Sequence, residues 1–339
     1  MIIVLKPRIS RAEEQAVLKE IRKLGYTPHV MRGVARTVIG AIGDELTHAN
    51  LETLATQFPR AVESVLPIQK RYKLVSREAH PANSTIRVRE HVIGGKKLHV
   101  MAGPCSVESE KQLLATAKAV KAAGATFLRG GAFKPRTSPY EFQGLGEKGL
   151  KLLAKARKET GLAVITELLS ENHAEMVAEY TDIIQIGARN AQNFQLLIAA
   201  AKTGKPVLLK RGLSMKIEEW LLAGEYVLAN ENPNLLFCER GIRTFETYTR
   251  NTLDLSTIPI IKRETHCPIV IDPSQGAGRA DLVAAMCKGA VAMGADALLI
   301  EVHPNPAEAW SDGAQQLPLA KFAELMKELK PFIAAAGRE

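Results

Sequence analysis

The sequence lacks the features by which membrane, secreted and nucleic-acid-binding proteins are usually recognised. The chain has 339 residues, and none of its apolar runs approaches the ~20 residues that a membrane-spanning helix needs. The apolar N-terminal stretch is too short for a signal peptide. Its four cysteines form neither a CxxC pair nor a disulfide framework. Aromatic residues make up only 5%, and no zinc-finger or RNA-module motif is present. We therefore expect a cytoplasmic protein that binds neither membranes nor nucleic acid.

The chain is basic, with 45 Lys and Arg against 36 Asp and Glu and a net charge of +9. A generally basic, soluble surface would account for much of this excess. However, four apolar, strand-like runs each end in a cation beside glycine, which favours attraction of an acidic substrate at those points. Arg and Lys clustered over glycine-rich backbone suit phosphate and carboxylate groups. The cations are Arg129, Arg189, Lys210 with Arg211, and Arg240.

Residues 1–68 are predicted to form a small ferredoxin-like α+β domain. Ser10 with Glu13 three residues later has the spacing of a capping box, which indicates the start of a helix. Such domains often serve regulation or oligomerisation, although the fold alone does not fix a function. Residues 69–97 are polar and mixed and are predicted to be a linker. The expected order of the split motif is strand 2–5, a helix from residue 10, strands 26–31 and 37–42, helix 45–57 and strand 62–67.

Residues 98–339 alternate strand and helix patterns, which predicts an α/β fold with a (β/α)8 TIM barrel. A doubly wound sheet is the alternative. The barrel is preferred because functional-looking residues follow nearly every strand, and a barrel gathers these strand ends at one face. Strands are expected to begin near Leu98, Ala125, Ala163, Asp182, Pro206, Asn234, Pro268 and Ala297.

Three potential metal ligands follow strands that would be neighbours in a closed barrel. Cys105 follows the first strand, Glu301 lies in the eighth, and Asp312 lies in the loop after it. Each residue taken alone is more often structural. Together, a thiolate and two carboxylates suit a divalent transition metal.

The loop after the second strand, residues 128–140, is the richest in functional groups. Its glycines let the backbone approach a ligand closely, and its two prolines stiffen it. A solvated basic loop is the alternative, but apolar residues and prolines are interleaved among the charges. The polar residues of interest are Arg129, Lys134, Arg136, Thr137 and Ser138.

In these motifs, the sequence resembles 3-deoxy-D-arabino-heptulosonate 7-phosphate (DAHP) synthase, in the branch with an N-terminal ferredoxin-like domain. The resemblance covers essentially the whole chain, and the motifs occur in the expected order. They are Gly-Pro-Cys-Ser at 103–106, Leu-Arg-Gly-Gly-Ala-Phe-Lys-Pro-Arg-Thr-Ser-Pro-Tyr at 128–140, Phe-Gln-Gly-Leu-Gly at 142–146, Ile-Gly-Ala-Arg-Asn at 186–190, Leu-Lys-Arg-Gly at 209–212 and Glu-Val-His-Pro at 301–304.

The resemblance implies condensation of phosphoenolpyruvate with erythrose 4-phosphate to DAHP and phosphate, the first step of the shikimate pathway. It also implies a divalent metal of the Mn, Fe, Co or Zn class, a homotetramer, and tyrosine or phenylalanine as a feedback effector. The effector would bind between N-terminal domains of neighbouring subunits. The related synthase of 3-deoxy-octulosonate 8-phosphate, which uses arabinose 5-phosphate, is one alternative. A catalytically weak, ligand-sensing barrel is another.

By the same resemblance, each motif residue has an expected role at the mouth of the barrel. The residues expected to take part in catalysis are Lys134, Cys105 and Asp312. The expected ligands are Arg129 and Lys134 for the carboxylate of phosphoenolpyruvate; Arg189, Lys210 and Arg240 for its phosphate; Arg136 and Thr137 for the phosphate of erythrose 4-phosphate; and Cys105, Glu301, Asp312 and Gln275 for the metal.

Gln275 departs from the family pattern, in which a histidine is expected as the fourth metal ligand. An amide oxygen is a neutral, harder donor and should bind a transition metal less tightly. Three interpretations remain open: Gln275 ligates weakly or orders a water, His303 supplies the imidazole, or the site works poorly or without metal. His266 is a poor substitute, because it lies nine residues earlier, at the opposite end of the seventh strand.

Overall fold

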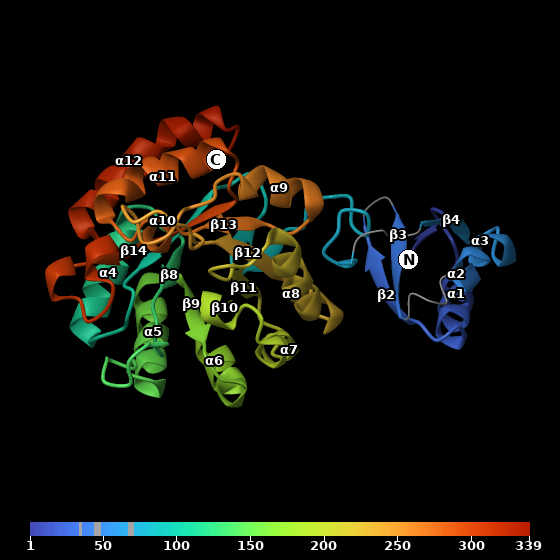
Figure 1. Cartoon of the computed structure of the whole chain (residues 1–339), viewed down its shortest axis with the longest axis horizontal. Helices are drawn as coiled ribbons and strands as arrows, with labels where there is room; N and C mark the ends of the chain where they lie inside the picture. The colour runs from blue at the N-terminus through green and yellow to red at the C-terminus, as the bar shows by residue number, and fades with distance from the viewer. Residues whose placement is uncertain (34–35, 44–48, 67–70) are drawn as a thin grey trace. The chain divides into compact units, whose positions relative to one another are not determined.

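The computed structural model describes residues 1–33, 36–43, 49–66 and 71–339 of the chain. These residues divide into two compact units, residues 1–83 with 263–266 and residues 84–262 with 267–339 (Figure 1). The predicted helix 45–57, strand 62–67 and linker 69–97 each extend partly outside the described residues. The predicted domain bounds themselves stay a prediction.

The N-terminal unit contains the predicted ferredoxin-like fold. Its four strands form one sheet in the order β2-β3-β1-β4, with antiparallel pairing throughout. The capping box is present, because Ser10 Oγ accepts from the backbone N–H of Glu13 and the Glu13 carboxylate accepts from that of Ser10. Its described elements are β1 Ile2–Leu5, α1 Arg11–Lys23, β2 Thr27–Arg32, β3 Thr37–Ile42, α2 Ala49–Glu52, α3 Leu54–Gln57 and β4 Val62–Leu66.

The second unit contains the predicted (β/α)8 barrel, which confirms the fold class. Its eight parallel strands run from β7 to β14 in chain order, and pairing of β13 with β14 and of β14 with β7 closes the ring. The strands are β7 His99–Gly103, β8 Phe127–Arg129, β9 Ala163–Leu168, β10 Ile183–Ile186, β11 Val207–Lys210, β12 Leu235–Glu239, β13 Ile269–Ile271 and β14 Ala297–His303, and the short β15 Leu317–Pro318 pairs with β14.

Helices surround the strands, as expected for this fold (Figure 1). The barrel strands are buried on both faces, and for this reason they appear in the sequence as short apolar runs. The helices are α4 Glu110–Ala122, α5 Glu147–Thr160, α6 Ala174–Tyr180, α7 Phe194–Lys202, α8 Ile217–Ala229, α9 Thr257–Glu264, α10 Pro273–Ala277, α11 Ala280–Ala292 and α12 Leu319–Ala335.

The segment predicted as a linker carries structure that its polar composition does not indicate. β5 Ile86–Val88 and β6 His91–Ile93 pair as an antiparallel hairpin. The side chains of Ile86, Val88 and Ile93 belong to the same buried cluster as Met101 and Phe127 of the barrel strands. Residues 86–93 are thus part of the core of the barrel unit, since every second residue of a strand points to the same face.

None of the described helices is both long and apolar enough to cross a membrane.

His99, at the start of β7, should make the barrel less stable in mild acid. Burial lowers the pKa of His99 to about 4, against an ordinary value of about 6.5, and its ring nitrogens contact Thr126 Oγ1 and the Val92 carbonyl. Between these two pKa values the unfolded chain binds a proton that the folded chain does not, so stability falls as pH falls. The melting temperature should drop by several degrees across this window. A His99→Gln variant, measured by circular dichroism, should show a weaker pH dependence; an unchanged dependence would contradict the assignment.

Candidate functional site

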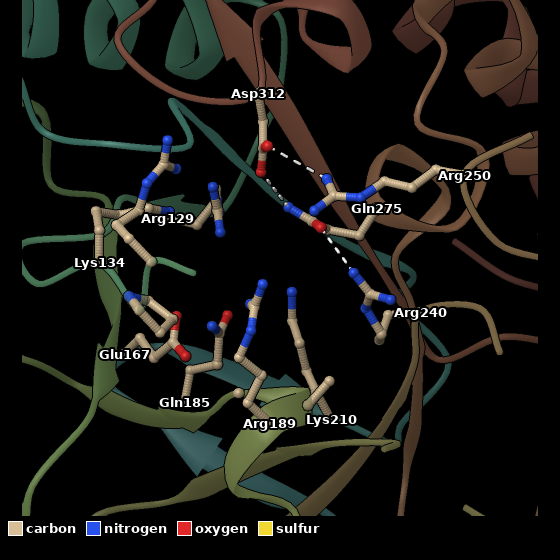
Figure 2. Close-up of a pocket in the computed structure, with 14 residues that line it drawn as sticks. Arg129, Lys134, Glu167, Gln185, Arg189, Lys210, Arg240, Arg250, Gln275 and Asp312 are labelled. Atoms are coloured by element: carbon tan, nitrogen blue, oxygen red, sulfur yellow. Dashed lines mark hydrogen bonds and ion pairs between the residues drawn. The ribbon is translucent and has the colours of Figure 1, made fainter. Parts of the chain in front are cut away.

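A pocket lies at the carboxyl-terminal ends of the barrel strands, and the predicted cations converge on it (Figure 2). Because every strand of a closed parallel barrel ends at the same face, residues far apart in sequence meet there. Of the predicted substrate ligands, the pocket is lined by Arg129, Lys134, Arg136, Arg189, Lys210 and Arg240.

Arg129 and Lys134 are buried and are anchored by groups of β14 and of the segment that follows β7. Arg129 Nη1 donates to the carbonyl of Pro104 at 2.9 Å and to Glu301 Oε1 at 3.0 Å. Lys134 Nζ lies 2.9 Å from Cys105 Sγ and 3.1 Å from the Cys105 carbonyl oxygen. Both cations line the pocket, and these contacts hold them there without a ligand.

Lys210 and Arg211 are adjacent in sequence but serve different environments. Lys210 lines the pocket and donates to Asp272 Oδ2 at 2.6 Å. Arg211 does not line it; its Nη1 lies 3.0 Å from both Glu239 Oε2 and Asp254 Oδ2. Successive residues at a strand end point in opposite directions, which explains why only one of the pair faces the pocket.

Arg189 and Arg240 keep donors available for a ligand. Arg189 is exposed and makes no hydrogen bond or ion pair within the described part of the chain. Arg240 is only 6% exposed, and its Nη1 has no hydrogen-bond partner among the described residues. A buried, unpartnered guanidinium nitrogen is costly unless an acceptor occupies the pocket, and phosphate or carboxylate oxygens are suitable acceptors.

The two residues predicted for the second phosphate lie differently. Arg136 lines the pocket and pairs with Glu141, with Nε 3.2 Å from Oε2. Thr137 is exposed and is not among the residues that line the pocket.

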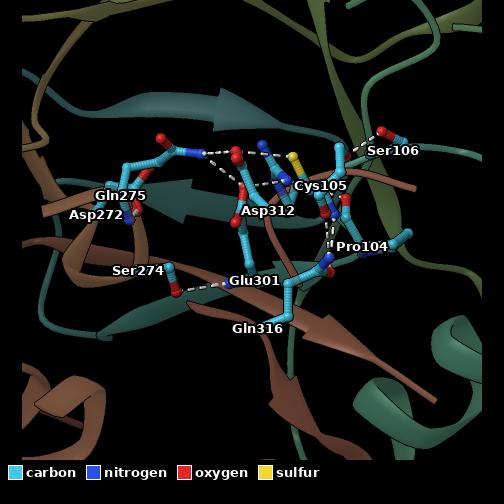
Figure 3. Close-up of polar contacts among 12 residues, drawn as sticks. Pro104, Cys105, Ser106, Asp272, Ser274, Gln275, Glu301, Asp312 and Gln316 are labelled. Atoms are coloured by element: carbon cyan, nitrogen blue, oxygen red, sulfur yellow. Dashed lines mark hydrogen bonds and ion pairs between the residues drawn. The ribbon is translucent and has the colours of Figure 1, made fainter. Parts of the chain in front are cut away.

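Three of the four predicted metal ligands, one thiol and two carboxyl groups, come together beside the pocket (Figure 3). Ligand atoms of Cys105, Glu301 and Asp312 all lie within 4.8 Å of one another. The thiol of Cys105 donates to Asp312 Oδ2 at 3.4 Å. A soft sulfur with two carboxylates is a donor set that fits a divalent transition metal.

The charge states of this cluster follow from its surroundings. Burial, followed by the nearby Glu301 carboxylate, raises the pKa of Cys105 to about 11, so the free site holds a thiol at neutral pH. Burial opposes ionisation of Asp312, but Arg250 and then Lys134 lower the pKa of Asp312 to about 2. Since a metal binds the thiolate, ligation by Cys105 would release a proton.

Gln275 lies against this cluster and presents its amide nitrogen to it. Nε2 donates to Glu301 Oε1 and to Asp312 Oδ2, both at 3.0 Å (Figure 3). Oε1 accepts from Arg240 Nη2 at 2.8 Å (Figure 2). The predicted fourth ligand is therefore adjacent to the other three, with its nitrogen rather than its oxygen directed at them.

His303, the alternative imidazole, is engaged elsewhere. Its Nε2 lies 3.1 Å from Glu108 Oε2, and its Nδ1 accepts from the backbone N–H of Asn305 at 3.1 Å. It is not a member of the Cys105, Glu301 and Asp312 group.

Three of the polar or charged residues that line the pocket were not predicted: Glu167, Gln185 and Arg250. Glu167 and Gln185 interrupt the apolar runs of β9 and β10, and a polar residue inside a buried strand is the signal that could have identified them. A Cβ on Gly187 would lie 1.9 Å from Glu167 Oε1, so the glycine makes room for this carboxylate. Arg250, which pairs with Asp312 at 3.2 Å, lies in a loop without any such signal.

Comparison with known proteins supports one family. Residues 79–335 match the DAHP synthetase I family, and residues 1–70 match the DAHP synthase ferredoxin-like domain. The phospho-2-dehydro-3-deoxyheptonate aldolase of Thermotoga maritima is 49% identical over 99% of both chains. The chain belongs to the DAHP synthetase I family. A crystal structure of the DAHP synthase from T. maritima is similar with a TM-score of 0.79 at 48% identity, covering 100% of this chain and 98% of that one.

Two other relatives are similar to this chain over only part of its length. A truncated form of the T. maritima synthase gives a TM-score of 0.75 at 50% identity, covering 79% of this chain and 98% of that one. The 2-dehydro-3-deoxyphosphooctonate aldolase of Syntrophotalea carbinolica is 33% identical over 72% of this chain and 94% of its own length. The octulosonate alternative is thus less well supported than DAHP synthesis.

Family membership confirms the predicted enzyme class and reaction. The chain is a DAHP synthase, which condenses phosphoenolpyruvate with erythrose 4-phosphate, and it carries the family's N-terminal ferredoxin-like domain. The family is metal-dependent, and the described residues contain one group of His, Cys, Asp or Glu that could hold a metal.

Proposed function

We propose that the pocket at the barrel mouth binds phosphoenolpyruvate through five cations. Arg129 and Lys134 hold its carboxylate, while Arg189, Lys210 and Arg240 hold its phosphate. The observation that supports this assignment is the convergence of these cations on one pocket next to the Cys105, Glu301 and Asp312 cluster. Because two anionic substrates repel each other, a cation-lined pocket is needed to bind them together.

Erythrose 4-phosphate is proposed to bind with its phosphate on Arg136 and Thr137. Arg136 lines the same pocket, so the two substrates would share one cavity. Thr137 follows Arg136 directly, and its exposed hydroxyl is available to a phosphate that extends from the pocket toward solvent. Sharing a cavity converts the condensation into a reaction between oriented neighbours.

The proposed metal ligands are Cys105, Glu301, Asp312 and, more weakly, Gln275. The expected ion is of the Mn, Fe, Co or Zn class, because the donor set combines a soft sulfur with oxygen ligands. When bound, it supplies Lewis-acid polarisation of the aldehyde. Lys134, between Cys105 and the pocket, contributes a fixed positive charge where negative charge develops on the aldehyde oxygen.

The cations also serve the departure of phosphate. C3 of the enol attacks the aldehyde carbon, positive character develops at C2, and a water adds there before phosphate leaves. Lys210 and Arg240 stabilise the charge on the departing phosphate, and Asp272 holds Lys210 in place by accepting a hydrogen bond from its Nζ.

The test is an assay of the purified full chain with phosphoenolpyruvate and erythrose 4-phosphate, following loss of the enol. We expect turnover that a chelator abolishes and an added divalent metal restores. Turnover that ignores a chelator, in protein that elemental analysis finds free of metal, would contradict the metal assignment. No turnover with erythrose 4-phosphate under any metal would favour the sensing barrel, or the octulosonate enzyme if arabinose 5-phosphate reacts.

For regulation, tyrosine or phenylalanine is proposed to inhibit the enzyme through the ferredoxin-like domain of a homotetramer. The support is the match of residues 1–70 to the ferredoxin-like domain of DAHP synthases. Inhibition should disappear when residues 1–68 are deleted and turnover is retained. Inhibition by both amino acids that survives the deletion would rule this out, and light scattering of the full chain tests the tetramer.

A further inference from the structure

The Gln275 amide bridges the anion pocket and the metal-ligand cluster. On one side, Arg240 Nη2 donates to Oε1 at 2.8 Å; on the other, Nε2 donates to Glu301 and Asp312 at 3.0 Å each (Figures 2 and 3). The amide is therefore the one group among these contacts that is bonded to both a proposed phosphate ligand and two proposed metal ligands.

The partners determine which way the amide faces while no metal is bound. An amide oxygen only accepts and an amide nitrogen only donates. Reversing the group would place its oxygen against two carboxylates and its NH₂ against a guanidinium, so all three hydrogen bonds would be lost. With the carboxylates free, the nitrogen faces the cluster, and an amide nitrogen is not a metal ligand.

For Gln275 to ligate a metal, the amide must turn its oxygen toward the cluster. The backbone of this residue is held, because its N–H donates to Asp272 Oδ1 at 2.9 Å and its carbonyl accepts from Asn251 Nδ2 at 2.9 Å. Only the side-chain amide is therefore free to turn, about its terminal torsion. Turning gives up the bond from Arg240 and places NH₂ against the guanidinium, which opposes metal binding.

Arg240 has a reason to release this bond when an anion binds. It is buried, it lines the pocket with Lys210 and Arg189, and its Nη1 is without a partner among the described residues. A phosphate that occupies the pocket offers charged oxygens to the guanidinium, and these are stronger acceptors than a neutral amide oxygen.

We propose that Arg240 positions the Gln275 amide and through it couples phosphate binding to metal binding. Without an anion, Arg240 holds the amide oxygen away from the cluster, so metal binds weakly. Phosphoenolpyruvate draws the guanidinium to its phosphate, which frees the amide to present its oxygen to the metal. The coupling rests on the proposed roles of Arg240 and Gln275, and by linkage the metal must strengthen phosphoenolpyruvate binding by the same factor.

The probe is cobalt(II), titrated into the metal-free full chain and followed by its absorption, with and without phosphoenolpyruvate. Since a hydrogen bond from a charged donor is at stake, phosphoenolpyruvate should tighten cobalt binding by roughly ten-fold. Cobalt should tighten phosphoenolpyruvate binding equally, as measured by calorimetry.

Gln275→His separates this coupling from direct contact between phosphoenolpyruvate and the metal. An imidazole needs no amide rotation, so the variant should bind cobalt at least about ten-fold more tightly without phosphoenolpyruvate. If phosphoenolpyruvate touches the metal directly, the resulting gain in cobalt affinity remains in this variant. The gain that depends on turning the Gln275 amide is removed. The phosphoenolpyruvate effect should therefore be several-fold smaller than in the natural chain.

A matched pair of charge-conserving variants tests the role of Arg240. Arg240→Lys shortens the side chain that holds Oε1 and should tighten cobalt binding in the absence of any anion. Arg189→Lys, in the same pocket but without a contact to Gln275 among the described residues, should leave that affinity unchanged.

Two results would overturn the proposal. One is a phosphoenolpyruvate effect that is absent in the natural chain or equally large in Gln275→His. The other is a change in cobalt affinity that is the same for both lysine variants. If cobalt binds tightly to an active synthase but independently of phosphoenolpyruvate, only the proposed coupling is contradicted. If cobalt does not bind under any condition, the proposed coupling and the proposed metal site are both contradicted.

Discussion

Replacing Lys134 with methionine is expected to lower kcat by roughly 10²- to 10³-fold, the usual loss when one preorganised charged donor is removed from an active site. Methionine matches the unbranched lysine side chain as far as Cε but removes the charged ammonium group. The Nζ atom lies 2.9 Å from Cys105 Sγ and lines the pocket, so its charge acts on both the metal cluster and the bound substrates. Steady-state assays that vary phosphoenolpyruvate separate the loss in kcat from a rise in KM.

Lys151→Met is the matched control for the same chemical change. Lys151 is exposed on α5 and pairs only with Glu147, 2.8 Å away, among the described residues. Surface pairs of this kind contribute little, so the control should keep kcat, KM and melting temperature. A Lys134→Met protein that melts normally and turns over at the natural rate would exclude Lys134 from catalysis.

The sequence could predict the barrel and most of the pocket because both depend on strand order. Strands buried on both faces read as apolar runs, and closure brings their ends together, so Arg129, Arg189, Lys210 and Arg240 meet in one pocket. Arg211 carries the same sequence signal as Lys210 but points to Glu239, because direction at a strand end alternates residue by residue.

What the sequence could not predict depends on contacts between distant residues. The direction of the Gln275 amide is decided by Arg240 on one side and by Glu301 and Asp312 on the other, and no local pattern records these partners. The hairpin at residues 86–93 was missed because its few apolar residues, among them Ile86 and Ile93, are recognisable as core only once the barrel is present.

Replacing Cys105 with serine should weaken metal binding by at least about 100-fold, since removal of a group that merely supports a ligand already costs up to about that much. Serine preserves the size of the side chain and can still donate to Asp312 Oδ2, the contact that the thiol makes at 3.4 Å. What it removes is the soft sulfur that selects a transition metal in this donor set. Elemental analysis after dialysis should find the variant depleted of metal, and its turnover should fall with the metal content.

Cys287→Ser makes the same change at a buried cysteine outside the site, on α11. Serine in a helix can bond to the carbonyl one turn earlier, so the control should fold, at some cost in melting temperature, and should keep its metal. Equal metal content in the two variants would show that the Cys105 sulfur is not a ligand, and the thiol would then be a packing residue beside Lys134. Loss of metal from Cys105→Ser alone, together with the Gln275→His result, would define both the strong and the weak ligand of the site.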